Sequence, residues 1–329
     1  MNAPAAHSPS AWIAVDGGST NTRVWLLHEG RVIARASAGV GARVTAQDGS
    51  PDKLRAALRE LIAQVCAEDR GVQPSLVAAA GMITSALGLL EVAHVPAPAS
   101  EQDLARGARQ ASVAEVTSLP FFLFPGVRCG DLAAADVSQT DVMRGEETLC
   151  VGLLADERFK PPFSLLNLGS HWKLNEVDGA GRIARSRTSL SGELIHATQT
   201  STILASGLPA GKLERLDSAW CEHGMTELRR SGLARALFCV RLLEMHDRGT
   251  PGQRMSFLIG AYVAAELDAL WVADRPAMAG SVILAGSGAI ARAWEAALTH
   301  KQLKAHKLTE PEAEAAFVAG IGRLVQIVA

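Results

Sequence analysis

The residues whose types and spacing best suit chemistry lie in an expected strand–turn–strand at positions 12–27. Asp16 ends the first strand, where a carboxylate can hold a hydrated Mg²⁺. The glycines that follow lack a Cβ and let the backbone approach a ligand. Hydroxyl, amide and backbone donors come next, and these groups suit phosphate oxygens. The segment therefore predicts a metal ligand at Asp16 and a phosphate loop of Gly17, Gly18, Ser19, Thr20 and Asn21. The alternative interpretation is an ordinary hairpin with a polar turn.

A second copy of this plan lies later in the chain. Gly18 and Gly169 are 151 positions apart, and so are Gly30 and Gly181. With this offset, Asp16 corresponds to Asn167 and Ser19 corresponds to Ser170. A period this long indicates two similar halves, each opening with a three-stranded meander, rather than a repeat array. The second half then offers its own phosphate loop, with candidate residues Gly169, Ser170, His171 and Lys173.

Hydrophobic patterning around these loops alternates strands with helices, which is typical of the α/β class. The best hinge is 156–162, where charged residues precede two prolines that fit neither helix nor sheet. We therefore expect an N-terminal domain of residues 1–156 and a C-terminal domain of residues 157–329. Expected strands are 32–37, 76–80, 120–124 and 281–284, with a second meander at 163–188; expected helices are 51–68, 141–155, 289–298 and 312–328, with mostly helical patterning over 190–273 and irregular or polar connections at 95–98 and 131–140.

Composition limits the class of protein and of partner. A chain of 329 residues exceeds what one hydrophobic core usually supports. A net charge of −2 with scattered Lys and Arg gives no reason to expect nucleic acid. The 5 cysteines lack CxxC spacing and suit a reducing compartment, and residues 1–10 read as a tail rather than a signal peptide. Since no apolar stretch approaches the ~20 residues of a membrane span, we expect a cytoplasmic protein without a membrane partner.

A late strand–glycine–helix at positions 281–291 has two interpretations. Its glycines fit the dinucleotide fingerprint G-x-G-x-x-A. That fingerprint needs an acidic residue about 20 positions further on at a strand end. Glu310 has the spacing, but it precedes a proline and a helix. We therefore prefer a turn that packs against an adenine ring, formed by Gly286, Ser287 and Gly288.

Together these motifs resemble the sugar kinase/Hsp70/actin superfamily. More narrowly, the chain is similar to the 2-dehydro-3-deoxygalactonokinase family over nearly its whole length. The sequence departs from the family pattern in two places. Residues 167–173 differ from the family's second loop but keep its hydrogen-bond donors. Leu89 and His94 stand where the family has tryptophan and tyrosine near the sugar-acid pocket. The motifs that carry the resemblance are DGGSTNTR at 16–23, GM at 81–82 with Ser85, DVMRGEET at 141–148, RTSLSGEL at 187–194, FLIGAY at 257–262 and LAGS at 284–287.

The resemblance implies two ribonuclease-H-like lobes of the actin-like ATPase type, with a nucleotide cleft between them. It places the first phosphate loop and the sugar-acid pocket in the N-terminal lobe, and the second phosphate loop and the adenine site in the C-terminal lobe. It leaves open that the last helix packs back on the N-terminal lobe. The implied reaction is phosphorylation of the 6-hydroxyl of 2-dehydro-3-deoxy-D-galactonate by ATP and Mg²⁺, in galactonate catabolism.

Phosphoryl transfer depends on positioning, charge neutralisation and a base for the attacking hydroxyl. Asp141, at the start of its expected helix, is the candidate base; Glu146 and Glu147 are alternatives, and a plain N-cap would also use aspartate there. The carboxylate of a 2-keto acid needs a cation, ideally an arginine, for which a surface ion pair is the alternative role. The candidates for binding this carboxylate are Arg144, Arg187 and Arg23, and Arg144 is also a candidate catalytic residue. Further substrate-binding candidates are Gly81, Met82, Ser85 and Ser191 from the shared motifs, and Glu193, whose carboxylate can accept hydrogen bonds from sugar hydroxyls.

Other functions leave weaker traces in the sequence. Glu193-x-x-His196 has the spacing of a metal site, but it has no cluster of ligands nearby. Neither loop serine has a histidine and aspartate arranged for a hydrolase triad. A kinase of another sugar stays open, as does an ATPase that acts on a protein client. A sugar sensor would need a DNA-binding extension, for which residues 1–10 are too short. The sequence leaves a homodimer open.

Overall fold

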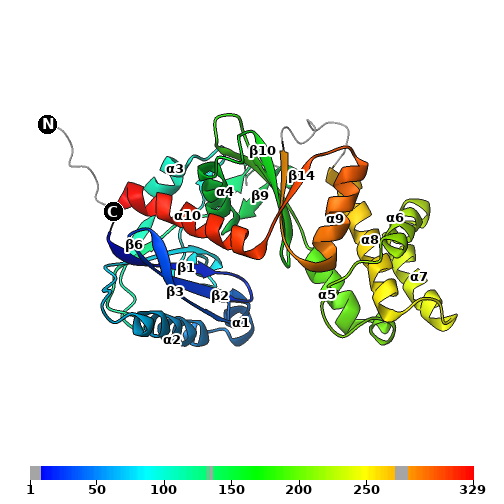
Figure 1. The fold of residues 1–329 in the computed structure, drawn as a ribbon, viewed down its shortest axis with the longest axis horizontal. Coiled ribbons are helices and arrows are strands. Elements are labelled where there is room, and N and C mark those ends of the chain that lie inside the picture. The colour runs from blue at the N-terminus through cyan, green and yellow to red at the C-terminus, as the bar shows by residue number, and fades with distance from the viewer. Residues whose placement is uncertain (1–8, 132, 134–135, 271–280) are drawn as a thin grey trace. The chain divides into compact units, whose positions relative to one another are not determined.

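The chain divides into two compact units, which we describe separately (Figure 1). The computed structural model describes residues 9–131, 133, 136–270 and 281–329. The expectations for residues 1–8 and 271–273 therefore lie outside the described residues. Unit 1 comprises residues 1–161, 177–186 and 314–329, and unit 2 comprises residues 162–176 and 187–313. Each unit is thus assembled from stretches that are separated in the sequence.

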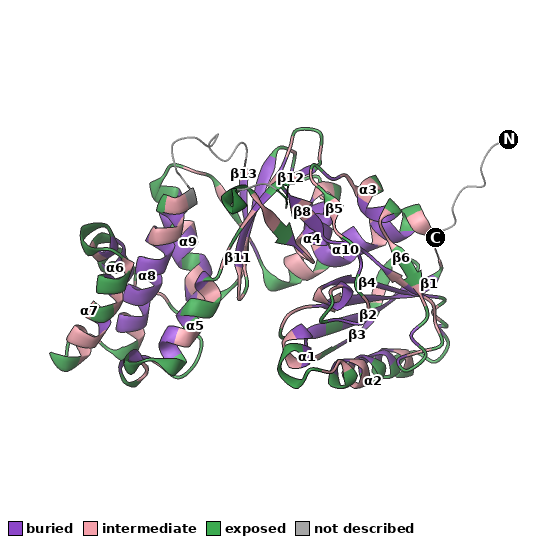
Figure 2. Ribbon diagram, turned by 180° about the vertical axis from the view of Figure 1, so that it is seen from behind, coloured by how far each residue is buried: buried purple, intermediate pink, exposed green. Residues whose placement is uncertain are grey.

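Unit 1 is built on a six-stranded sheet with the order β3-β2-β1-β4-β7-β6. The first three strands form an antiparallel meander, and β4 and β7 continue the sheet in parallel with β1. Successive residues of β1 and β4 are buried, which shows that both faces of the sheet are covered there (Figure 2). The strands are β1 Ala11–Gly17, β2 Thr22–His28, β3 Arg31–Ala38, β4 Val77–Gly81, β6 Arg109–Ala111 and β7 Phe121–Leu123.

The other elements of unit 1 are helices and a second, smaller sheet. Helix α2 (Asp52–Glu68) buries one apolar stripe, as its period of hydrophobic residues predicts. A second sheet has the order β5-β8-β9 and consists of short strands. The bounds are α1 Ala42–Asp48, η1 Met82–Thr84, β5 Val95–Pro96, α3 Glu101–Arg106, β8 Val127–Cys129, η2 Val137–Gln139, β9 Asp141–Met143, α4 Glu146–Ala155 and α10 Glu310–Val328.

Helices α4 and α10 approach each other at two glycines. A Cβ on Gly152 of α4 would overlap the backbone of α10, and a Cβ on Gly320 of α10 would overlap the backbone of α4. Glycine is required on both sides because the two backbones are in contact. The final helix also bonds to the meander, since Trp25 Nε1 donates to Glu314 Oε1 at 2.8 Å.

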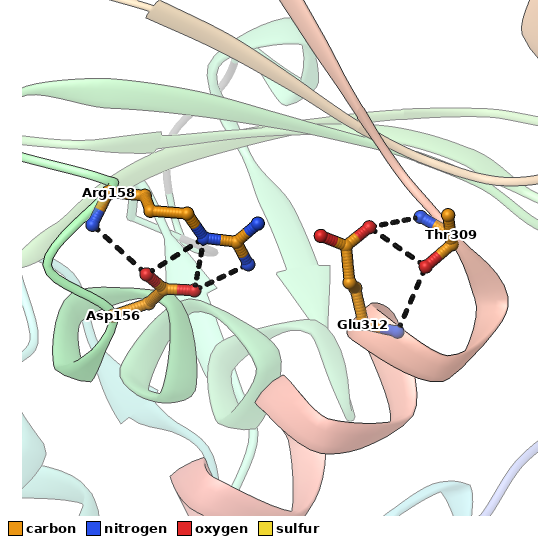
Figure 3. A network of polar contacts seen from close by, with 4 residues as sticks. All are labelled: Asp156, Arg158, Thr309 and Glu312. Atoms are coloured by element: carbon orange, nitrogen blue, oxygen red, sulfur yellow. Dashed lines mark hydrogen bonds and ion pairs between the residues drawn. The ribbon is translucent and has the colours of Figure 1, made fainter.

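The ends of these helices are fixed by local side-chain bonds (Figure 3). Before α10, the backbone and hydroxyl of Thr309 both donate to Glu312 Oε2 at 2.8 Å, and Glu312 N donates to Thr309 Oγ1 at 3.3 Å. This reciprocal pair is a capping box. After α4, the carboxylate of Asp156 accepts from the backbone and guanidinium of Arg158 at 2.7–3.1 Å. The first pair caps the start of α10, and the second orders the turn that follows α4.

A five-stranded sheet, formed mostly by unit 2, follows the same plan, with the strand order β12-β11-β10-β13-β14. Strand β13 runs parallel to β10, as β4 runs parallel to β1. Helix α8 is the largely buried centre of a helical group on this unit (Figure 2). The bounds are β10 Phe163–Leu168, β11 Trp172–Val177, β12 Ile183–Ser189, α5 Ser191–Ser201, η3 Ile203–Gly207, α6 Ser218–Ser231, α7 Leu233–Met245, α8 Pro251–Leu270, β13 Ser281–Ala285, α9 Gly288–His300 and β14 Ala305–Leu308.

The predicted α/β class is confirmed, and one expected helix is corrected. Residues 141–143 form strand β9 instead of the first turn of a helix, and α4 begins at Glu146. The reason is that β9 pairs with β8 and that Gly145, at φ +108°, bends the chain before the helix. Strands β5, β6, β8 and β14 were not expected. Residues 95–96, predicted as part of an irregular connection, form β5 because they pair with β8. In the described part of the chain, no helix combines the length and apolarity that a membrane crossing requires.

Candidate active site

The turn after β1 is closed by its own backbone. Gly18 N donates to Asn21 O at 2.8 Å, so residues 18–21 form a compact connection to β2. A Cβ on Gly41, which precedes α1, would overlap the backbone of Gly18 and Ser19. Ser19 is half-buried, whereas Thr20 and Asn21 are exposed. The predicted phosphate loop is therefore a tight turn covered by a glycine at the start of the next helix.

Three glycines from separate segments lie close together next to Asp16, and Gly81 is the one beside its carboxylate. Gly17 of β1 is the register partner of Gly81 of β4. A Cβ on Gly81, which has φ +91°, would lie 2.7 Å from Gly17 O and 3.4 Å from Asp16 Oδ1. A Cβ on Gly145 would lie 3.4 Å from the Cα of Gly81. The absent side chain of Gly81 leaves a space beside Asp16 Oδ1 that a Cβ would fill.

Two charged neighbours set the electrostatics at Asp16. Arg23 is its partner across the β1–β2 pair, and Arg23 Nη1 lies 3.1 Å from Asp16 Oδ2. Burial raises the pKa of Asp16; Arg23 opposes the rise, and the carboxylate of Glu146 adds to it. The pKa is raised overall although an arginine is bonded to the carboxylate. Burial therefore has a larger effect on the carboxyl of Asp16 than its arginine partner.

A hydrated Mg²⁺ fits the residues around Asp16. Mg²⁺ in proteins keeps several waters and takes one or two carboxylates together with phosphate oxygens. Asp16, the space beside its Oδ1, and the nearby Glu146 meet that requirement. Among the residues that the structure describes, no group of three or more His, Cys, Asp or Glu could hold a metal ion by itself. Glu193 and the exposed His196, which have the sequence spacing of a metal site, therefore belong to no such group among the described residues.

The bend before α4 is stabilised by a buried carboxylate. Glu147 is fully buried, and each of its side-chain oxygens accepts from Gly145 N at 2.8 Å. Asp141 does not cap this helix, because it lies in β9 opposite Cys129, and its Oδ1 accepts from its neighbour's backbone N–H at 2.7 Å. The N-cap role is thus excluded, whereas its role as the base stays a prediction. Glu146, in the first turn of α4, is the candidate that is electrostatically coupled to Asp16.

Arg144 is engaged with the segment that follows η1. Its Nη1 donates to Thr84 Oγ1 at 3.0 Å, and its Nη2 donates to Val92 O at 2.7 Å and lies 3.4 Å from His94 Nδ1. Thr84 Oγ1 donates onward to Gly81 O at 3.0 Å. Burial lowers the pKa of Arg144, and two nearby glutamates oppose the change. The arginine therefore connects this segment to the glycines beside the carboxylate of β1.

The shared motif at the end of β4 forms η1 and its continuation. Ser85 Oγ donates to Met82 O at 2.7 Å, and both residues are half-buried. Leu89 is buried in the core of unit 1, where it packs with Ile83 and other apolar side chains. The predicted substrate residues Met82 and Ser85 thus follow directly after Gly81, next to the phosphate turn.

Unit 2 repeats the covered turn. Residues 169–171 connect β10 to β11, and a Cβ on Gly192 would overlap the backbone of Gly169 and Ser170. Glu193 N donates to Ser170 O at 2.7 Å. Gly41 and Gly192 are 151 positions apart, which is the offset that relates the two turns. The duplication therefore extends from the sequence of the turns to the glycine that covers each of them.

The side chains around the second turn contact one another. His171 Nε2 lies 3.2 Å from Glu193 Oε2, so a predicted phosphate residue and a predicted substrate residue are in contact. Lys173 is buried in β11. Ser191, at the start of α5, donates from Oγ to Glu266 Oε1 at 2.5 Å. Lys173 and Glu193 thus place charge of both signs next to the second turn.

Arg187 and the glycine-rich turn after β13 occupy other parts of unit 2. Arg187 Nη1 donates to Ala269 O at 3.1 Å, and Arg187 also lines a small hollow with Glu266. Gly286 is packed so that its Cβ would lie 2.8 Å from a side-chain atom of Leu168. The two other predicted adenine-site residues are the exposed Ser287 and Gly288, which begins α9 at φ +66°. Contact of this turn with an adenine ring stays a prediction.

Comparison with known proteins decides the family. A family model described as 2-keto-3-deoxy-galactonokinase matches residues 16–324. The chain belongs to this family. A 2-dehydro-3-deoxygalactonokinase of Escherichia coli (strain K12) is 29% identical over 324 residues, which covers 97% of this chain and 98% of the relative. Membership makes the protein a phosphotransferase of the sugar-kinase type and confirms the predicted family.

Solved structures show the fold of this galactonokinase family member. A crystal structure of a candidate 2-dehydro-3-deoxygalactonokinase from Sinorhizobium meliloti has a TM-score of 0.74 and 23% identity, with 95% of this chain and 97% of that chain covered. Component A of the (R)-2-hydroxyglutaryl-CoA dehydratase of Acidaminococcus fermentans has a TM-score of 0.50 and 11% identity, with 95% and 96% covered. The predicted actin-like ATPase fold with two ribonuclease-H-like units is confirmed.

Three features of this family member were missed by sequence reasoning. Thr84 was not singled out, although its hydroxyl holds Arg144, because the two lie 60 positions apart. Glu266 lies 75 positions from Ser191, and no pattern relates them. The covering glycines did carry a signal, since Gly41 and Gly192 share the 151-residue offset of the turns. Extending that frame beyond the turns would have found them.

Proposed function

We propose that this protein is an ATP-dependent kinase that phosphorylates the 6-hydroxyl of 2-dehydro-3-deoxy-D-galactonate, as a cytoplasmic enzyme of galactonate catabolism. Family membership and the activity named for the Escherichia coli relative support the reaction class. The observation that carries the proposal is the duplicated turn, closed by Gly41 in one unit and by Gly192 in the other. Two such turns suit a nucleotide's phosphate chain, because backbone and hydroxyl donors can approach several phosphate oxygens.

Each candidate residue has a role in this proposal. The turns at 17–21 and 169–173 hold phosphates, and the turn at 286–288 packs on the adenine. Asp16 holds Mg²⁺, which neutralises phosphate charge when bound. Asp141 accepts the proton of the attacking hydroxyl, with Glu146 as the alternative base. Met82 and Ser85, which follow Gly81, contact the sugar acid, and Ser191 and Glu193 are its proposed contacts from unit 2.

The arginines need a more specific assignment. Arg23, Arg144 and Arg187 each donate to an acceptor within the protein. A guanidinium has five N–H donors, so these bonds leave capacity for a ligand. Arg187, in the shared motif RTSLSGEL at 187–194, is proposed as the partner of the substrate carboxylate. Arg144 is better explained by its bonds to the segment after η1.

The experiment that tests the proposal is ADP release from MgATP with a panel of acceptors. The panel contains 2-dehydro-3-deoxy-galactonate, its gluconate epimer, galactonate and galactose. Turnover confined to the 2-keto-3-deoxy acids supports the proposal. Turnover on neutral sugars alone keeps a kinase and rejects the carboxylate pocket. ADP release that is independent of any acceptor favours an ATPase that acts on a protein client.

The base is tested by comparing D141N with E146Q under the same conditions. Loss of turnover in D141N with ATP affinity retained supports Asp141, because a removed base slows the proton transfer without changing nucleotide contacts. Near-full turnover in D141N, with loss in E146Q, transfers the role to Glu146.

A further inference from the structure

The ion pair between Arg23 and Asp16 lies where a divalent cation is expected. The two residues are register partners at the ends of β1 and β2, so the hairpin itself sets their separation. Arg23 Nη1 lies 3.1 Å from Asp16 Oδ2, while Asp16 Oδ1 faces the space beside Gly81. One carboxylate oxygen is therefore bonded to an arginine, and the other lies beside the position that a Cβ of Gly81 would occupy.

The exposure of the two side chains differs. The side chain of Arg23 is 47% exposed, whereas that of Asp16 is 20% exposed. The arginine thus reaches the carboxylate from the solvent side and can leave without disturbing the core. In the part of the chain that the structure describes, Arg23 is the cation that bonds to Asp16. Its departure would leave Asp16 next to Glu146 without that compensation.

We propose that Arg23 is a built-in competitor of the divalent cation, so that cation and arginine exchange at Asp16. This inference rests on the proposed function, in which Asp16 holds Mg²⁺. A +2 ion at Asp16 is repelled by a guanidinium within a few ångströms, and it gains the full attraction of the carboxylate only after the arginine moves away. The exchange keeps Asp16 paired in the absence of ligand and makes cation binding without nucleotide weak.

The test measures Mn²⁺ binding to the full-length protein by the EPR signal of free Mn²⁺, without nucleotide or sugar. R23Q removes the competing charge and is expected to bind Mn²⁺ about threefold to fivefold more tightly than the wild type. R35Q is the matched control, because Arg35 also lies in the meander but pairs with Glu314 at 3.3 Å. R23K keeps the positive charge and is expected to stay close to the wild type.

The outcomes separate this inference from the proposed function. Equal Mn²⁺ affinity of R23Q and R35Q overturns the competition but does not bear on the proposed kinase function. Equal Mn²⁺ binding by the wild type and D16N overturns the site itself. Tighter binding in R23Q that disappears in the double variant D16N/R23Q supports the exchange at Asp16, and it does so even if the acceptor panel shows no sugar kinase. Circular dichroism of each variant verifies that its fold is retained.

Discussion

Arg144 Nη1 donates a hydrogen bond to the buried hydroxyl of Thr84 at 3.0 Å, across 60 positions of sequence. The same guanidinium donates to Val92 O, so a single side chain holds both ends of the segment that follows η1. Thr84 in turn donates to Gly81 O beside the candidate metal ligand. Arg144 is therefore a positioning residue, which acts on the substrate side of the site through the backbone that it fixes.

Replacing this arginine by lysine tests that role. R144K keeps the charge but loses the planar fork that reaches Thr84 and Val92 together. We expect a loss of about 1–3 kcal/mol in the free energy of unfolding and a higher KM for the sugar acid, with the KM for ATP less affected. Urea denaturation and steady-state kinetics measure both. The control R106K, at an exposed i,i+3 ion pair, should change stability by less than about 0.5 kcal/mol; a similar loss in both variants would contradict the prediction.

The covering glycine of the second turn should not tolerate a side chain. In G192A the new Cβ would overlap the backbone of Gly169 and Ser170, so the turn must move. We expect the KM for ATP to rise by about tenfold or more, because small displacements at a site are costly. In the control G179A, the Cβ meets no atom within 4 Å, and kinetics should stay unchanged. Equal ATP affinity of the two variants would separate the turn from the nucleotide.

The crossing of α4 and α10 gives a matched pair of substitutions on one helix. G320A would drive a Cβ into the backbone of α4, whereas the Cβ of G322A would lie at an ordinary 3.6 Å from the Trp12 ring. We expect G320A to lower the free energy of unfolding by about 3 kcal/mol. G322A should raise it by about 0.5 kcal/mol, because alanine suits a helix interior better. Chemical denaturation measures both, and a mild effect of G320A would show that the helices can separate.

Asp217 should make stability depend on pH at the start of α6. Hydrogen bonds from Gln253 Nε2 at 3.0 Å and from Trp220 N at 3.2 Å lower the pKa of its carboxyl below 3.8. A lowered pKa contributes stability above the unfolded value and loses it as the pH falls through the folded value. We expect D217N to be less stable than the wild type at pH 7 and the difference to shrink below about pH 3.8. Thermal melts across this range measure the gap; a constant gap would refute the assignment.

Local signals explain how much of the fold and site could be predicted. The turns at Gly18 and Gly169 follow directly from glycine and hydroxyl residues after an apolar run, and the stripe of α2 follows from its period. These elements depend on neighbours in the sequence, so pattern reasoning finds them. The position of Asp16 at the end of β1 follows in the same way.

The rest depends on contacts between distant residues. Asp141 was expected at a helix start, but it lies in β9 because β8 supplies a partner strand, which the local pattern does not contain. The bonds of Arg144 were equally invisible, since an arginine before a helix reads as a ligand contact until Thr84 and Val92 are placed beside it. Side-chain roles are thus harder to predict than elements, because they require the tertiary structure first.

The last helix has a consequence for the order of assembly during synthesis. Unit 1 contains residues 1–161 but also residues 314–329, so Gly152 of α4 and Trp25 of β2 lack their partners until the C-terminus has been made. Unit 2 is complete once residue 313 has left the ribosome. Domains generally fold as units in the order of their synthesis, yet here the half that emerges first is the half that is finished last. A nascent chain that stalls before α10 therefore presents an incomplete core in unit 1.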